Sequence, residues 1–307
     1  MDKNFTIAAI LTFSFLSLGF LLLHNGLFGY GISFFVFLPF ILGYLLGGSK
    51  TKKRSLLGFA FSFVIACFLL IEGGLEGMVC ILMAMPLILI SVGIGMLLKM
   101  IFSDLIGFVK KKEQDDSVLD DDILKSSILP FCILSMVGFA EQQLTKNANE
   151  VVEVRSEIIL PYTPMQVYDA IKTVDTLDAE KPFLMQLDLP LPQKCILEAE
   201  EVGALRTCYF KGGGTITEQV TELEKGKVLR MDVLDYQLTG RTWLGFREAI
   251  YTFEALEDGT CKMARITSYT SELYPRVYWE PLERVGVQQE HEYVFRNLQK
   301  DLKREHN

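Results

Sequence analysis

The first third of the chain carries almost no charge. Between Phe5 and Leu98 the charged residues are Lys50, Lys52, Lys53, Arg54, Glu72 and Glu76. The apolar runs that they separate lie at about residues 5–23, 31–48, 55–71 and 77–98. A helix needs roughly 20 apolar residues to cross the hydrocarbon core of a bilayer, with about 17 as a lower limit. The sequence therefore predicts an integral membrane protein with four spans in this region.

A fifth apolar segment, at about residues 123–140, decides which side of the membrane the remaining chain occupies. Its uncharged core, Ser126–Ala140, is short and contains Pro130, so it either crosses the bilayer or forms a re-entrant or interfacial helix. We favour a crossing. The basic loops Lys50–Arg54 and Lys110–Lys112 are expected in the cytoplasm, which puts the N-terminus there too. With five crossings, the C-terminal part lies outside the cytoplasm.

The composition changes after Glu141, where charged residues recur every few positions as in an ordinary globular protein. We therefore expect a transmembrane region at 1–145 and a separate domain at 150–307. The net charge of −8 comes without a basic stripe, which argues against a nucleic-acid partner.

The cysteines do not identify a compartment. Cys195, Cys208 and Cys261 lie in the charged half, and an odd number without a CxxC motif argues against a disulfide framework and a zinc site. A single disulfide remains open if this half lies outside the cytoplasm. No metal or cofactor is expected.

The second half of the chain is predicted to form one strand, a short helix, six further strands and a long helix. Val151–Leu160 alternates and is rich in β-branched residues, and Thr163-Pro164 is typical of a helix start before Met165–Thr173. An irregular segment, Lys181–Gln193, follows. The later strands are predicted at Lys194–Glu201, Arg206–Phe210, Thr215–Glu224, Lys227–Tyr236, Arg247–Leu256 and Lys262–Leu273, and the last helix at Val277–Arg304.

Three groups of residues carry a resemblance to a known superfamily. They are Lys181-Pro182-Phe183 with Pro190 and Pro192; Arg206, Cys208 and Phe210 followed by glycines and Glu218; and Pro275, Tyr278-Trp279 and His291. Together they resemble the membrane-anchored bacterial members of the helix-grip superfamily (START-like, SRPBCC, polyketide cyclase/dehydrase and lipid transport). The Phe210–Glu218 interval is one residue longer than that pattern, which suggests a bulge or a larger turn.

The resemblance implies an α+β domain in which a curved antiparallel sheet of about seven strands surrounds the long C-terminal helix and leaves a cavity. It also implies a bacterial inner-membrane protein whose partners are the lipid bilayer and a hydrophobic or amphipathic small molecule, lipids included. Protein partners are not indicated.

Two features of the residues themselves point into such a cavity. A hairpin centred on Gly212 places Arg206 opposite Glu218, either to orient a ligand headgroup or as a purely structural ion pair. In the last helix, His291 lies at the centre of the stripe formed by Val287, Val294, Phe295, Leu298 and Leu302, with Arg284 on the same line. A histidine there is either a hydrogen-bonded core residue or part of a pocket wall.

The candidate ligand-binding residues are Arg206, Glu218, Tyr251, Tyr269, Tyr278, Trp279, Arg284 and His291. The first hypothesis is a membrane-tethered binding or transfer module. The alternative is a cyclase- or dehydratase-like enzyme that uses His291 with Arg206 or a pocket tyrosine. A third reading is a sensor or assembly protein with a vestigial pocket. The sequence contains no HExxH, GxSxG or P-loop motif that would indicate other enzyme classes.

Overall fold

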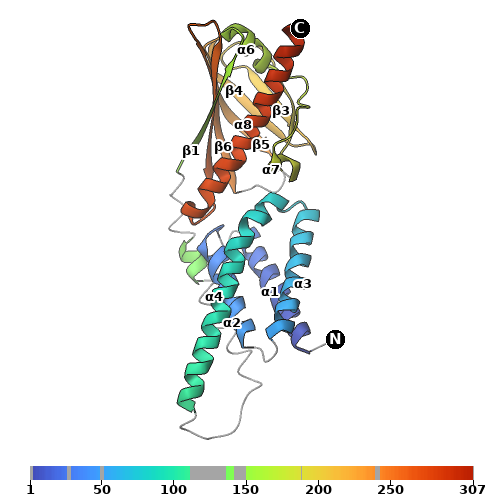
Figure 1. Cartoon of the computed structure of the whole chain (residues 1–307), viewed down its shortest axis with the longest axis vertical. Coiled ribbons are helices and arrows are strands. Elements are labelled where there is room, and N and C mark those ends of the chain that lie inside the picture. The colour runs from blue at the N-terminus through green and yellow to red at the C-terminus, as the bar shows by residue number, and fades with distance from the viewer. Residues whose placement is uncertain are drawn as a thin grey trace. The chain divides into compact units, whose positions relative to one another are not determined.

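The computed structural model describes residues 3–25, 29–48, 52–110, 136–141, 150–187, 189–238 and 243–306. The chain divides into two compact units. One consists mainly of the N-terminal helices, and the other mainly of the residues after 149. Figure 1 shows the helices and strands of both units.

The N-terminal unit is built from apolar helices. They are α1 (Lys3–His24), a π-helical turn η1 (Ser33–Phe37) that leads into α2 (Leu38–Gly47), α3 (Lys52–Glu72) and α4 (Met78–Lys110). Three of them are long and apolar enough to cross a membrane: Lys3–His24, Lys52–Glu72 and the Met78–Phe102 part of α4. They correspond to the predicted spans at 5–23, 55–71 and 77–98.

The predicted span at 31–48 forms a shorter apolar helical segment, Ser33–Gly47. At about 1.5 Å per residue, this segment is shorter than the roughly 30 Å hydrocarbon core. Its start is fixed by the Glu141 carboxylate, which accepts hydrogen bonds from the backbone N–H groups of Ile32 and Ser33 at 2.7 and 2.9 Å. The predicted segment at 123–140 lies outside the described residues except for its last positions.

Glycines allow α2 and α4 to approach closely. A Cβ on Gly43 would lie 2.1 Å from the carbonyl oxygen of Val92, and one on Gly95 would lie 2.1 Å from that of Phe40. Small residues at such crossings are typical of helix packing in membranes.

The C-terminal unit is a seven-stranded antiparallel sheet with the order β1-β7-β6-β5-β4-β3-β2. The strands are β1 (Val152–Leu160), β2 (Pro192–Leu197), β3 (Leu205–Phe210), β4 (Thr215–Glu224), β5 (Val228–Gln237), β6 (Leu244–Ala255) and β7 (Cys261–Ser271). Helices α6 (Pro164–Lys172) and α7 (Phe183–Leu187) connect β1 to β2. The sheet curls around the long helix α8 (Arg276–His306), as Figure 1 shows. The predicted fold class is confirmed.

Local sequence signals explain most of these boundaries. Helix α6 begins after Thr163, whose side chain accepts from the backbone of Gln166 while the Gln166 side chain accepts from the Thr163 backbone, so the capping box is complete. The β3–β4 hairpin pairs without a register shift, whereas the pairing of β4 with β5 shifts register between Thr217 and Glu218. Helix α7 was not predicted, because it is one turn long within a proline-rich segment.

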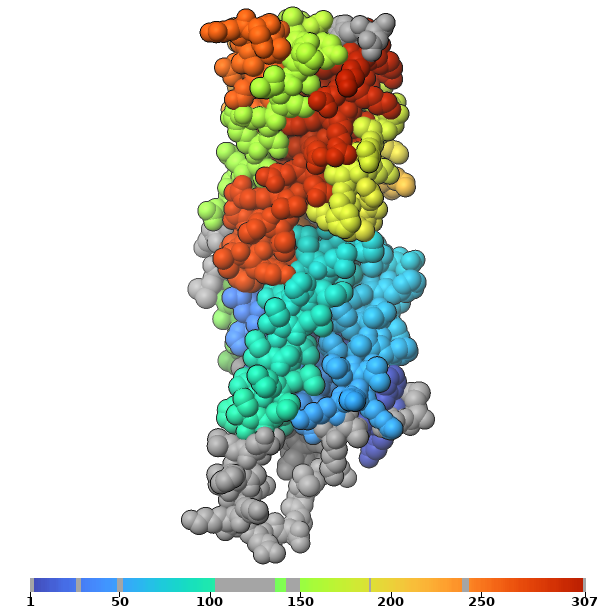
Figure 2. Space-filling model, viewed as in Figure 1, coloured from blue at the N-terminus to red at the C-terminus, as the bar shows by residue number. Residues whose placement is uncertain are grey.

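The core of this unit lies between the sheet and α8. The side chains of Leu229 and Met231 on β5 and Met263 on β7 are completely buried there, together with Leu302 of α8. Tyr293 and Asn297 are also buried although they lie outside the predicted stripe, because they bond the backbone of the segment 177–179. The opposite side of α8 forms part of the molecular surface (Figure 2).

Candidate functional site

A row of polar side chains follows β7 on the face that contacts α8. Residues two apart on a strand point to the same face, so Arg265, Thr267, Tyr269 and Ser271 all face the helix. Arg265 pairs with Glu290 at 2.9 Å and Thr267 contacts His291 at 2.8 Å. The Tyr269 and Ser271 hydroxyls donate to Glu283 at 3.3 and 2.7 Å. The row joins the later part of β7 to the first half of α8.

His291 is fully buried in this row, and both of its ring nitrogens have partners. Its Nε2 lies 2.8 Å from Thr267 Oγ1, and its Nδ1 lies 2.9 Å from Ser156 Oγ on β1. Burial, reinforced by the nearby positive charge of Arg265, lowers the pKa of His291 to about 2. The imidazole is therefore neutral at physiological pH, with the contacts of a hydrogen-bonded interior residue.

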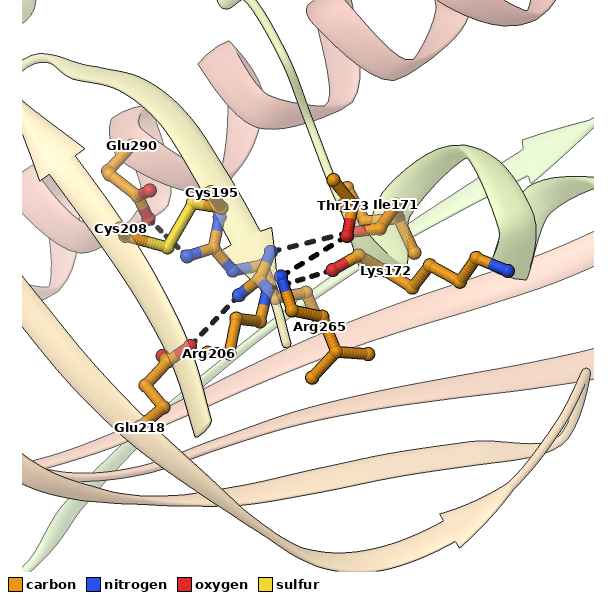
Figure 3. Close-up of a disulfide and its surroundings, with 10 residues drawn as sticks. Ile171, Lys172, Thr173, Cys195, Arg206, Cys208, Glu218, Arg265 and Glu290 are labelled. Carbon is orange, nitrogen blue, oxygen red and sulfur yellow. Dashed lines mark hydrogen bonds and ion pairs between the residues drawn. A yellow bond between two sulfur atoms is a disulfide. The ribbon is translucent and has the colours of Figure 1, made fainter. Parts of the chain in front are cut away.

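Arg206 and Glu218 form the cross-strand pair that the Gly212 hairpin predicted. The two residues are directly opposite on β3 and β4, and Arg206 Nη1 donates to Glu218 Oε2 at 2.9 Å. Arg206 Nε and Nη2 donate to the carbonyl oxygens of Lys172 and Ile171 at 3.1 and 3.3 Å. Each guanidinium nitrogen thus has an acceptor, and the side chain also closes the C-terminal end of α6 (Figure 3).

Arg265 has a different environment. Its Nη2 pairs with Glu290, but Nε and Nη1 are buried and contact no acceptor among the residues that the structure describes. The guanidinium carbons of Arg206 and Arg265 lie 5.7 and 5.5 Å from the centre of the Tyr251 ring, so two cations share one aromatic neighbour. Burial raises the pKa of Glu290, while Arg265 acts in the opposite direction.

Arg265, Glu290 and Glu283 were not among the site residues predicted from the sequence. A signal for Arg265 was present, because its position in β7 has the same parity as Met263, Thr267 and Tyr269. An arginine in phase with apolar and aromatic residues faces the interior. Glu283 and Glu290 fall outside the apolar stripe of the helix, so periodicity alone does not place them inward.

The structure brings some of the predicted site residues together and separates others. Arg206, Glu218 and Tyr251 lie in one buried group with Arg265, and His291 lies next to it. Tyr269 is further along the same face of β7. Tyr278 and Trp279 form an edge-to-face pair, with ring centroids 5.1 Å apart, at the start of α8. Arg284 is bound to Glu280 and to the backbone of Glu153, with 40% of its side chain exposed, outside the buried group.

A disulfide joins the strands beside this group. Cys195 on β2 and Cys208 on β3 are directly paired, with Cα atoms 4.0 Å apart. Cys208 is two residues from Arg206 on the same face of β3, and Figure 3 shows the disulfide next to both arginines. The odd number of cysteines and the absence of a CxxC motif had argued against a disulfide framework, but a single disulfide remained possible. One bridge is what these two strands contain.

Solved structures similar to this chain cover about half of it. A START superfamily protein from Mycobacterium smegmatis is 9% identical with a TM-score of 0.37, over 50% of this chain and 97% of that one. An aromatase/cyclase from a Streptomyces species is 13% identical with a TM-score of 0.36, over 50% and 95%. A protein of unknown function from Staphylococcus aureus is 16% identical with a TM-score of 0.35, over 50% and 98%.

The strand order and the position of α8 make the C-terminal unit a helix-grip domain, and the topology itself carries this assignment. No protein-family model matches the sequence, and no curated protein matches it.

Proposed function

We propose that the C-terminal unit binds one apolar or amphipathic small molecule, such as a lipid, on the inner face of its sheet beneath α8. The N-terminal helices would hold this binding domain at a membrane. The protein would then store, present or transfer its ligand beside the bilayer.

The change from polar to apolar along α8 is the observation that carries this proposal. The first half of the helix turns Glu283, Glu290 and His291 toward the sheet. The second half contributes buried Phe295 and Leu298 to the apolar cluster. An interior that is polar at one end and apolar at the other is complementary to a molecule with a polar head and an apolar tail.

The disulfide supports a location of this unit outside the cytoplasm. Disulfides persist in oxidising compartments and are rare in the cytosol. Cys195 and Cys208 are paired across neighbouring strands, and the loop charges favour the same compartment if the segment at 123–140 crosses the membrane. We therefore propose a multi-pass protein of the bacterial inner membrane, with a cytoplasmic N-terminus provided that the shorter segment Ser33–Gly47 also crosses the bilayer.

The contacts of His291 do not favour the cyclase or dehydratase alternative. A general base is most effective with a pKa near the working pH, whereas that of His291 is about 2. Both ring nitrogens are also bonded to hydroxyl groups of the protein. No contact in the described part of the chain favours a reaction over binding.

Small molecules that co-purify with the full chain test the proposal. Ala249 is buried on the inner face of β6, and Ala255 is exposed at the end of the same strand. Ala249→Phe should fill the inner face, and Ala255→Phe is the matched control. Mass spectrometry of solvent extracts should find one amphipathic molecule per chain in the wild type and in Ala255→Phe, and much less in Ala249→Phe. An empty wild type, or equal amounts in both variants, would overturn the proposal.

A further inference from the structure

Arg265 carries more hydrogen-bond donors than its surroundings satisfy. A guanidinium has five N–H donors, and Nε and Nη1 account for three of them. In Arg265 both of these nitrogens are buried without an acceptor in the described part of the chain, where only Nη2 is paired. In Arg206, by contrast, all three nitrogens have acceptors. Buried donors are almost always paired, so those of Arg265 indicate an additional acceptor.

The position of Arg265 suits the head of an interior ligand. It pairs across the sheet with Ser156 of β1 and Tyr251 of β6, so it lies near the middle of β7 and one strand in from the edge of the sheet. The next inward residue toward the start of β7 is Met263, which belongs to the apolar cluster. The free donors of Arg265 therefore lie at the boundary between the polar and apolar parts of the interior.

Glu290 is a replaceable counterion for Arg265. Its carboxylate contacts Arg265 through one oxygen, and 24% of its side chain is exposed. Glu218 is paired with Arg206, so its ion pair does not depend on Glu290. A ligand anion can form two parallel bonds with a guanidinium edge, which a single carboxylate oxygen does not.

We infer that Arg265 binds the anionic head, a carboxylate or a phosphate, of the ligand of this domain, and that Glu290 competes with that head for the guanidinium. This inference rests on the proposed function and narrows the ligand to an amphipathic anion.

The anion site at Arg265 can be tested by measuring the equilibrium binding of matched probes to the full chain in lipid nanodiscs. The signal from empty nanodiscs is subtracted. The probes are oleate, oleyl alcohol, which has the same chain without the charge, and inorganic phosphate. The variants are Arg265→Gln and Glu290→Gln. Arg230→Gln is the control, because Arg230 lies on β5 with 43% of its side chain exposed and pairs with Glu222 and Glu248.

The wild type and Arg230→Gln should bind oleate about tenfold more tightly than oleyl alcohol, and Arg265→Gln should bind the two alike. Glu290→Gln should bind oleate more tightly than the wild type does. A gain in affinity cannot arise from misfolding, so this variant keeps the test valid if Arg265→Gln is unstable. Phosphate binding that depends on Arg265 would also support the anion site and would identify a free anion as one source.

The remaining outcomes separate the two proposals. Equal affinities for oleate and oleyl alcohol in the wild type mean that the Arg265 donors are hydrated only, which overturns the anion site and leaves the binding function standing. An unchanged preference in Arg265→Gln also overturns the anion site. If neither oleyl compound binds, the proposed function fails, and the anion site survives only if phosphate binding requires Arg265.

Discussion

Two arginines that contact the Tyr251 ring on the inner face of one sheet have different roles. Arg206 is bonded to Glu218 and to the last carbonyls of α6, so it stabilises the junction between helix and sheet. Arg265 is bonded through one nitrogen and keeps donors for another group. Of the two readings offered for the Arg206–Glu218 pair, these contacts fit the structural one, and the ligand-orienting reading fits Arg265 better.

Replacing Arg206 with Met should destabilise the C-terminal unit by about 3–5 kcal/mol, because Glu218 is then a buried charge without its partner. The double variant Arg206→Met with Glu218→Leu should be less destabilised than Arg206→Met alone. Urea unfolding followed by tryptophan fluorescence measures both, since the two tryptophans of the chain, Trp243 and Trp279, lie in this unit. If the double variant lost as much stability as the two single variants together, the two residues would not stabilise the unit as a pair.

His291 should make the unit sensitive to mild acid. Its pKa is about 2 when folded and about 6.5 when unfolded, so the unfolded state binds more protons as the pH falls below 6.5. Its contribution to stability is present above pH 6.5 and decreases toward pH 2.

Between pH 7 and pH 5 the wild type should therefore lose about 2 kcal/mol more stability than His291→Gln, which cannot titrate. The same urea unfolding experiment at the two pH values measures this difference. Equal losses in both proteins would show that His291 is not held in its neutral form.

At the scale of elements, β2 depends on a covalent link as well as on backbone pairing. It is short, pairs with β3 alone among the strands of the described residues, and has a register shift between Pro192 and Lys194. Cys195 also pairs with Val174, so the disulfide ties the segment after α6 to the sheet.

Cys195→Ser with Cys208→Ser should lower the free energy of unfolding by about 3 kcal/mol, because the two cysteines close a loop of 13 residues. Reductant should lower the stability of the wild type by a similar amount and leave the double variant unchanged. If reductant also destabilised the double variant, the loss of stability in the wild type would not come from this disulfide alone.

Most elements of the C-terminal unit could be predicted from local signals, and the exceptions have physical causes. The strand β4 (Thr215–Glu224) was predicted with the bounds it has, since a glycine-rich turn precedes it and a lysine-glycine turn follows it. Helix α7 is too short for periodicity to detect. The N-terminal segment Ser33–Gly47 reads as a span by composition, but Glu141, far away in the sequence, fixes where it starts. Arg265 could have been found by strand parity, whereas its pairing with Glu290 depends on the tertiary fold.

At the scale of the whole molecule, the fold class and the membrane region come from independent features. Apolar helices α1, α3 and α4 are long enough to cross a bilayer, and the strand order of the C-terminal unit is that of a helix-grip domain. Their presence in one chain supports the proposal of a ligand-binding domain that is tethered to a membrane.

The topology can be measured with reporters fused after Asn307. Alkaline phosphatase, which needs disulfides, should be active there, and a cytoplasmic fluorescent reporter should be dark. Fusions in the basic loop at Lys50–Arg54 provide the opposite control, because that loop is expected in the cytoplasm. The reverse pattern at Asn307 would place the domain in the cytosol and leave the disulfide without an oxidising compartment.

Photo-crosslinking locates the ligand most directly. A fatty acid with a diazirine on its chain is added to membranes that contain the full protein, and labelled peptides are mapped by tandem mass spectrometry. Binding beneath α8 predicts labels on inner-face residues such as Met231, Ala249 and Phe295, and a large decrease of these labels in Ala249→Phe. Labels confined to helices α1, α3 and α4 would contradict binding inside the C-terminal unit.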